Sequence, residues 1–415
     1  MKIIFSWFTI NNKPDHLKLG LFFLLTLFAG LIFSHALQSI SIGLLVANTL
    51  FNKNVRENIY EYFNDRVLII LSLFFITFLL SGIYSEDKQY WLQKLNVRLA
   101  FVLIPVGMIA LRNMTHKTFQ WLLYFFMWLI VASSIAVLVN YIEHYDVVNG
   151  MYSAGQTMET PHSHVRFSLM VCFSVFIGWY LYQGDFQPLF RGEKYLTLLA
   201  TVLLIVFLHV MAVRSGLLAF YLCAVFLLLR SVFLLRKWRQ GFFALLLLMM
   251  LPVIAYNFFP SVKTKFQYMK YDLNQYFSFN QVAGLSDATR LLSMKNGIEI
   301  LKENIWIGVG AGDVKNEALK KYVGYPEIKT ASKLPHNQIV WELASVGFIG
   351  FALFWFASMF PLFYNRNYTD PLFVCLHIIL FSSYLTEATL DDSNGNGLYL
   401  IFLILIYFQL RKKKG

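Results

Sequence analysis

Long apolar runs constrain the fold of this chain more than any other feature of its sequence. Crossing the hydrocarbon core of a bilayer takes about 20 apolar residues in a helix, and apolar types make up 58% of the 415 residues. The runs are apolar on all sides, whereas the strands of a membrane barrel would alternate apolar and polar residues. We therefore predict an all-α polytopic membrane protein with about twelve spans. They lie near residues 17–34, 36–51, 67–83, 98–112, 119–142, 165–182, 195–212, 216–234, 241–258, 338–363, 371–389 and 396–410.

Basic and acidic residues differ between alternate loops, which predicts the orientation of the spans. Cytoplasmic loops are enriched in Lys and Arg. With both termini inside, the inner connections carry Arg112, Lys117 and the tail RKKKG, whereas the outer stretch 143–163 contains no Lys or Arg. The pattern therefore predicts that the connection after the ninth span faces outward.

One long polar segment divides the chain into three parts. Residues 259–337 separate nine predicted spans in 1–258 from three spans and a basic tail in 338–415. The block from Asp287 to Gly312 has the apolar spacing of a helix, so we predict a mainly helical outer loop. Basic residues outnumber acidic ones in it, as expected for a surface that meets phosphates or anionic headgroups. A solvated face beside anionic lipid explains the same excess.

Polar residues also interrupt the apolar runs at two outer positions. Residues 195–234 contain two spans by length, and the sequence predicts a turn at Arg214, Ser215 and Gly216. An arginine at bilayer depth costs roughly 2.5–3.5 kcal/mol on insertion scales, so Arg214 needs a partner or an interfacial position. The second interruption, ETPHSHVRF, places His162, His164 and Arg166 at the start of the sixth span. Two such histidines suit a metal site or an interfacial cap.

Three glycines and two aspartates elsewhere in the chain are predicted to have structural roles. Gly308, Gly310 and Gly312 alternate as in some nucleotide loops, but no strand precedes them and no Walker lysine follows. We expect them to cap a helix and to allow close approach of the backbone. Asp391 and Asp392 are expected to cap a turn, with substrate contact as the alternative.

The cationic residues and one histidine fall at the same predicted membrane face. Arg214, Arg290, Arg166 and His336 all lie at the outer surface, and Asn337 follows His336 at the entrance to the tenth span. Arginine presents planar donors suited to phosphate or pyrophosphate. A neutral histidine can accept a proton from an attacking hydroxyl. Together these residues favour group transfer from a lipid-phosphate donor.

Three stretches of the chain resemble the bacterial O-antigen ligases and the wider ligase and polymerase superfamily. They are RSGLLAF at 214–220, DATRLLSMKNGIEILKENIWIGVGAG at 287–312 and PHNQIVWELASVGFIG at 335–350. The expected twelve spans, with one large periplasmic loop between the ninth and tenth, are similar too. The resemblance implies a glycosyltransferase of the bacterial inner membrane whose active site faces the periplasm.

The resemblance also implies roles for particular residues. Arg214 and Arg290 would hold the pyrophosphate of the donor, and His336 would act as general base or position the leaving group. Arg166 is a weaker candidate for the same anionic pocket, and Asn337 is a further substrate-binding candidate. The reaction would move a preassembled polysaccharide from undecaprenyl pyrophosphate to a sugar hydroxyl of the lipid A core, with inversion of the anomeric centre. We expect no metal, no cofactor and no nucleic acid partner, with membrane lipids as surroundings.

Other functions remain open from the sequence. An O-antigen polymerase would use the same donor with a second lipid-linked repeat as acceptor, and a protein O-oligosaccharyltransferase would glycosylate Ser or Thr. A polysaccharide or lipid transporter belongs to a different class. It would place charged residues or broken helices at the bilayer midplane, whereas the polar residues here gather at the outer face.

Overall fold

The computed structural model describes residues 9–10, 13–184, 186, 192–322 and 334–414. It is helical, apart from an antiparallel pair of two-residue strands, β1 (Thr9–Ile10) and β2 (Lys13–Pro14). The helices are α2 (His16–Phe33), α3 (His35–Leu50), α4 (Val55–Asn64), α5 (Arg66–Leu71), α6 (Leu73–Ser81), α7 (Lys88–Arg98), α8 (Ala100–Met108), η1 (Ile109–Leu111), α9 (His116–Glu143), α10 (Tyr145–Ser153), α11 (His164–Gln183), α12 (Glu193–Met211), α13 (Arg214–Phe233), α14 (Trp238–Phe258), α15 (Pro260–Phe279), α16 (Ser286–Glu303), α17 (Val314–Lys321), α18 (Gln338–Phe363), η3 (Tyr364–Thr369), α19 (Pro371–Tyr384), η4 (Thr389–Asp391) and α20 (Ser393–Lys414).

Each of the twelve apolar segments contains helix. Within the described residues, nine helices are long and apolar enough to cross a membrane, or ten if α4 with α5 and α6, bent by 72°, forms one span. α3 has 16 residues and α19 has 14, so both are shorter than these nine. The protein is therefore a multi-pass helical membrane protein, while the count of twelve spans stays a prediction.

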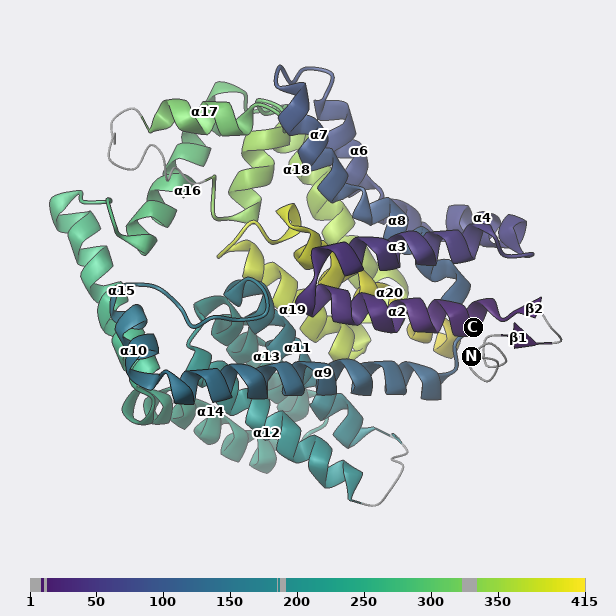
Figure 1. The fold of residues 1–415 in the computed structure, drawn as a ribbon, viewed down its shortest axis with the longest axis horizontal. Coiled ribbons are helices and arrows are strands. Elements are labelled where there is room, and N and C mark those ends of the chain that lie inside the picture. The colour runs from purple at the N-terminus through teal and green to yellow at the C-terminus, as the bar shows by residue number, and fades with distance from the viewer. Residues whose placement is uncertain (1–8, 11–12, 185, 187–191, 323–333, 415) are drawn as a thin grey trace.

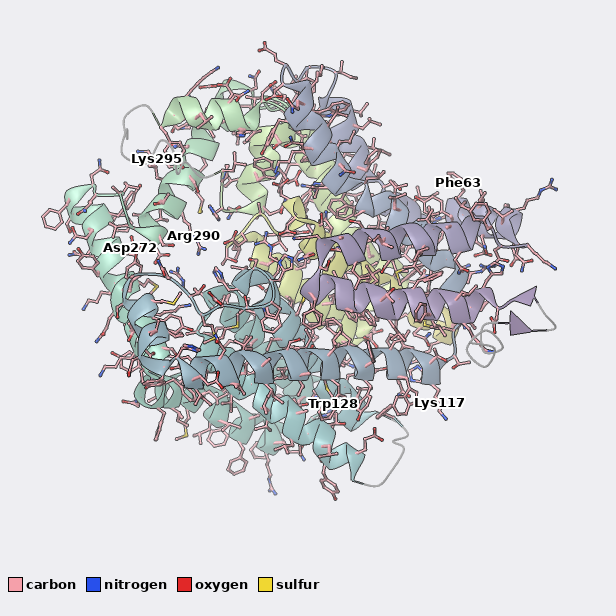
Figure 2. All side chains as sticks on the ribbon, viewed as in Figure 1. Phe63, Lys117, Trp128, Asp272, Arg290 and Lys295 are labelled. Carbon is pink, nitrogen blue, oxygen red and sulfur yellow. The ribbon has the colours of Figure 1, made fainter. Side chains whose placement is uncertain are left out.

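The long helices run between two ends of the molecule (Figure 1). At one end, Lys412 donates to the Met114 carbonyl at 2.8 Å and Arg411 pairs with Glu61 at 3.0 Å. α10, α15 and α16 lie at the opposite end. Figure 2 shows the same separation, with Lys117 far from Arg290 along the long axis. The basic residues predicted on the inner side therefore gather away from those predicted on the outer side.

The apolar core lies around α11 and α20. In the most apolar stretch of each helix, 78% of the residues of α11 and 94% of those of α20 are buried. The corresponding share for α14, at the periphery, is 11%. Phe402 of α20 contacts Phe28, Phe126 and Phe173, with ring centroids 4.6–5.4 Å apart. The three cysteines, Cys172, Cys223 and Cys375, are buried. α14 is thus left as a surface helix with an apolar exterior.

Two expected boundaries are wrong. The turn before α13 lies at Ala212, which has a left-handed φ of 50°, and extended Val213; Arg214 is already the first helical residue. The predicted span 371–389 also ends early, because α19 stops at Tyr384. Residues 385–392 then form a loop with the short η4, which we call the outer loop 385–392 after the membrane side that the order of the spans predicts for it. Ala212 and Leu385, the first residues after α12 and α19 end, line the same cavity.

The glycines do not cap α16, contrary to expectation, because that helix ends at Glu303 with Asn304 as its C-cap. Instead they allow close contact with α18, which is broken at Gly347 (φ 62°). Across this break the backbone N–H groups of Val309 and Gly310 donate to the carbonyls of Ala344 and Ser345 at 3.0 and 2.9 Å. A Cβ at Gly308 would lie 2.6 Å from that backbone. The expected close approach is therefore present, and it joins the loop to α18.

A buried group of charges connects α7 to α18. Arg98 and Glu342 form an ion pair with both side chains fully buried, and Gln338 donates to Glu342 at 2.7 Å. Nearby, Lys94 pairs with Asp391. We call Arg98, Glu342, Gln338, Lys94 and Asp391 the buried polar cluster. Asp391 therefore takes part in an ion pair, while Asp392 caps a turn by accepting from the Asn394 N–H at 2.8 Å.

Candidate functional site

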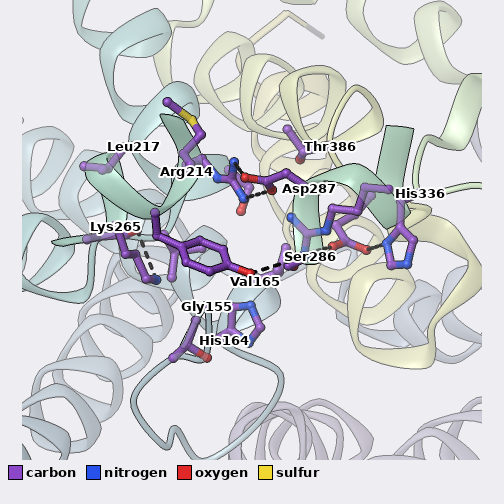
Figure 3. Close-up of a pocket in the computed structure, with 18 of the residues that line it drawn as sticks. Gly155, His164, Val165, Arg214, Leu217, Lys265, Ser286, Asp287, His336 and Thr386 are labelled. Carbon is purple, nitrogen blue, oxygen red and sulfur yellow. Dashed lines mark hydrogen bonds and ion pairs between the residues drawn. The ribbon is translucent and has the colours of Figure 1, made fainter. Parts of the chain in front are cut away.

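A cavity of about 790 Å³ opens among α13, α15, α16, the start of α11 and the outer loop 385–392. Figure 3 shows the side chains that these segments bring around it. Arg214, Arg290 and His336 all line the cavity, so the fold brings together three of the five predicted site residues. They come from separate parts of the chain, and each is placed by the start of a helix or by its first turns.

The position of Arg214 depends on how α16 begins. Asp272 of α15 accepts hydrogen bonds from the backbone N–H groups of Asp287 and Ala288 at 2.7 and 2.9 Å, which caps the helix. The Asp287 carboxylate then accepts a hydrogen bond from each of the two terminal nitrogens of Arg214. The distance from Nη1 to Oδ2 is 2.8 Å. The Arg214 side chain still has 51% of its surface exposed. It is held in orientation and remains open to the cavity.

Glu387 is the meeting point of three cationic or basic groups. Its carboxylate lies 3.1 Å from Arg290 Nη2, 3.7 Å from Arg166 Nη1 and 3.0 Å from His336 Nδ1. Burial alone would raise the pKa of Glu387. The hydrogen bond from His336 and the charges of His336, Arg290 and Arg166 outweigh it and bring that pKa to about 2. Glu387 is therefore ionised at neutral pH.

The charge of Glu387 decides how the His336 ring is protonated. An ionised carboxylate can only accept a hydrogen bond, so His336 Nδ1 must donate the proton across the 3.0 Å contact. In the neutral ring this leaves Nε2 with a free lone pair. A histidine oriented in this way by a carboxylate can take a proton at Nε2, and the carboxylate then offsets the new positive charge.

Asn337 and Arg166 hold the outer loop 385–392 against this histidine. Asn337 caps α18 by accepting from the Val340 N–H at 3.0 Å, and its amide donates to the Leu385 carbonyl at 3.2 Å. Arg166 donates to the Ala388 carbonyl at 3.3 Å. Neither residue is among those that line the cavity. Their predicted contact with substrate stays a prediction, and in this structure they position Glu387.

His162 and His164, at the start of α11, do not share a site. His164 lines the cavity, whereas the ring of His162 packs edge-on against His35 with centroids 4.5 Å apart. Among the residues that the structure describes, no group of three or more His, Cys, Asp or Glu side chains could hold a metal ion.

Three residues of the cavity were missed from the sequence: Asp287 as a partner of Arg214, Glu387 and Lys265. Glu387 offered a signal, because a lone carboxylate at the end of an apolar span needs a partner. Asp287 looked only like an ordinary first-turn residue of a helix. Lys265 resembled its exposed neighbour Lys263, and nothing in the local pattern separates the two.

Comparison with known proteins identifies the part of the chain that forms this site. Residues 199–355 match the family model described as O-antigen ligase. The match runs from α12 to α18 and contains Arg214, Arg290 and His336. No curated protein matches the chain significantly.

Proposed function

We propose that this chain is an O-antigen ligase, a membrane glycosyltransferase of the superfamily whose family model residues 199–355 match. It transfers a preassembled polysaccharide from undecaprenyl pyrophosphate to a sugar hydroxyl of the lipid A core. The observation that carries this proposal is the convergence of Arg214, Arg290 and a carboxylate-oriented His336 on one cavity.

The proposed chemistry assigns a separate task to each group. The acceptor hydroxyl gives its proton to His336 Nε2 and its oxygen attacks the anomeric carbon from the side opposite the phosphate. The bond between that carbon and the phosphate oxygen breaks, and the pyrophosphate leaves with the electron pair. Fixed cationic donors such as Arg214 and Arg290 stabilise the charge that develops there. One displacement of this kind inverts the anomeric centre, and the donor itself supplies the activated bond.

Free donors on both arginines support their assignment to the pyrophosphate. Arg290 uses Nη2 for Glu387, and its buried Nε has no hydrogen-bond partner among the residues that the structure describes. Arg214 is half exposed toward the cavity. Each guanidinium carries five N–H donors, so both can keep their carboxylate partner while binding a phosphate oxygen.

The proposal includes the topology that such a reaction needs. We propose twelve spans in a bacterial inner membrane, with 259–337 as the periplasmic catalytic loop between 1–258 and 338–415. The gathering of basic residues at the end opposite the cavity supports this orientation.

The first test is the lipopolysaccharide of a strain that lacks the gene, together with its undecaprenyl-linked glycans. Bare lipid A core with long polymer accumulating on the lipid carrier would support a ligase. Core bearing a single repeat would instead indicate a polymerase, and an unchanged ladder would contradict both.

A second test addresses the cationic groups with purified protein. We expect Arg290→Ala to lower kcat/KM for the lipid-linked donor about 10- to 100-fold, as for loss of a hydrogen bond to a charged group. Arg290→Lys should recover only part of the lost kcat/KM, because lysine lacks the planar pair of donors that arginine presents. Lys295→Ala is the matched control, since Lys295 is exposed on the same helix. Wild-type kinetics for both Arg290→Ala and Arg214→Ala would refute the pyrophosphate assignment.

A further inference from the structure

Lys265 of α15 brings a fourth basic side chain to the cavity, and its contacts differ from those of the arginines. Its Nζ donates to the carbonyls of Ala212 and Met211 at 3.3 and 3.5 Å, where α12 ends. The ammonium also lies over the ring of Tyr152, 4.7 Å from the centroid. Among the described residues, no carboxylate forms an ion pair with it. Lys265 is therefore held at the cavity wall by neutral groups.

The charged groups around Lys265 disfavour its protonated form. Arg214 faces it from α13 and Arg290 from α16, while Asp287 is the acidic group that favours its charge. His164 of α11 also lies within electrostatic reach. Burial first, and then the two arginines, lower the pKa of Lys265 to about 7. A large part of the Lys265 population is thus uncharged near neutral pH in the empty cavity.

A bound phosphate would reverse that balance. An opposite charge within about 4–6 Å favours the charged form of a titratable group. Lysine is a compact cation with three rotatable donors, and it binds phosphate as a point charge without the fixed geometry of arginine. The two carbonyl contacts of Nζ leave one donor of the protonated amine for an anion that lies between Arg214 and Arg290.

We propose that Lys265 is an additional phosphate-binding residue of the cavity, which takes up a proton from solvent when the anionic part of the substrate enters. This assignment rests on the proposed function, because it needs a donor that carries pyrophosphate. The step forms one N–H bond on the lone pair of Nζ and breaks no bond of the substrate. Release of the lipid pyrophosphate returns the proton to solvent.

Such a residue has a physical advantage over a third arginine. Three permanent cations around an empty cavity would repel one another in a partly dehydrated site. An amine that is neutral in the empty site avoids this repulsion and supplies its charge only when the substrate is present. The residue thereby links substrate binding to pH.

The experiment is calorimetric titration of the purified full-length protein in detergent with undecaprenyl pyrophosphate as the probe. Repeating it in two buffers with different ionisation enthalpies gives the number of protons taken up per molecule bound. At pH 8 we expect the wild-type protein to take up close to one proton more than Lys265→Met, since about nine-tenths of an amine with a pKa of about 7 is neutral there. At pH 6 this difference should largely disappear.

Two further variants complete the design. Lys263→Met removes an exposed lysine of the same helix, and it should match the wild-type protein in proton uptake and affinity. Lys265→Arg keeps a permanent charge, so it should bind the probe without the extra proton at pH 8. At pH 6 we expect Lys265→Met to bind about 10- to 100-fold more weakly than the wild type.

The outcomes separate this inference from the function on which it rests. Equal proton uptake by the wild type and Lys265→Met at pH 8, with binding intact, would overturn the role of Lys265 and leave the proposed donor standing. Failure of the wild-type protein to bind undecaprenyl pyrophosphate would overturn the proposed function and the inference together. Gel filtration of every variant shows whether a loss of binding reflects misfolding.

Discussion

Two groups of charged residues lie close together in this protein, and they differ in burial and in what surrounds them. In the buried polar cluster, Arg98 and Glu342 are fully buried and pair with each other, and none of its members lines the cavity. Around the cavity, Arg214, Lys265 and Arg290 face two carboxylates. The first group is closed and paired, whereas the second surrounds an open space with an excess of basic groups. A buried ion pair by itself therefore indicates architecture, and unbalanced charge around a cavity indicates a ligand.

The largest effect should come from His336 in the cavity group. We expect His336→Ala to lower the rate of glycan transfer by roughly 10²–10⁴-fold, the usual contribution of general base catalysis, while the protein stays folded. The measurement is kcat on purified protein with the lipid-linked donor. His144→Ala, at an exposed position after α9, is the control. A wild-type kcat for His336→Ala would remove the general base from the proposal.

Substitutions in the buried polar cluster should instead change the stability of the protein. Arg98→Ala leaves the Glu342 charge buried and unpaired, which should lower the free energy of unfolding by about 3–5 kcal/mol. The double variant Arg98→Met with Glu342→Leu should recover most of that loss, because neither charge remains. Denaturation in detergent measures the free energy of unfolding of the single and the double variant. An Arg98→Ala protein as stable as the wild type would break the comparison, since this pair would then not be structural.

Glu387→Gln tests whether a single negative charge organises the cavity group. The substitution removes the carboxylate that fixes the His336 tautomer, so kcat should fall about 10- to 100-fold, as for loss of a supporting hydrogen-bond partner. The folded-state pKa of Glu387 is about 2, below its ordinary value of 4.5. Its stabilising charge is therefore complete above pH 4.5 and is lost only as the pH falls through about 2.

The deficit of Glu387→Gln should accordingly persist over the whole range from pH 5 to 9 in a pH profile of kcat. If wild type and variant converge at pH 5, Glu387 is already protonated there and the assigned charge state is wrong.

Asn337 lies where the two groups meet, and its effect should be the smallest. Asn337→Ala removes the N-cap of α18, which should cost about 1 kcal/mol of stability, and it releases the Leu385 carbonyl. Asn337→Asp keeps the capping oxygen and loses only the donor to Leu385, so it should restore stability while kcat stays a few-fold low. Equal kcat for Asn337→Asp and the wild type would show that the tether to the outer loop 385–392 does not position Glu387.

The helices and the membrane class follow from the sequence because both depend on local composition. Apolar runs of sufficient length predict spans wherever they occur, and the residue types Arg214, Arg290 and His336 indicate anion binding and proton transfer. The exact ends and breaks of the helices depend on individual contacts. At the break of α18, Phe348 donates to the distant Ile305 carbonyl, and after α19 the Leu385 carbonyl accepts from Asn337. The apolar pattern contains no sign of either contact.

Pairing between distant residues was decided only by the tertiary structure. Arg98 and Glu342 are 244 positions apart in the sequence, and Arg290 and Glu387 are 97 positions apart. No periodic pattern encodes such contacts. The sequence by itself determined that this chain carries many charges at the ends of membrane helices. Only the fold decided which of them neutralise one another and which surround a cavity, because the energy of a charge depends on its neighbours in space.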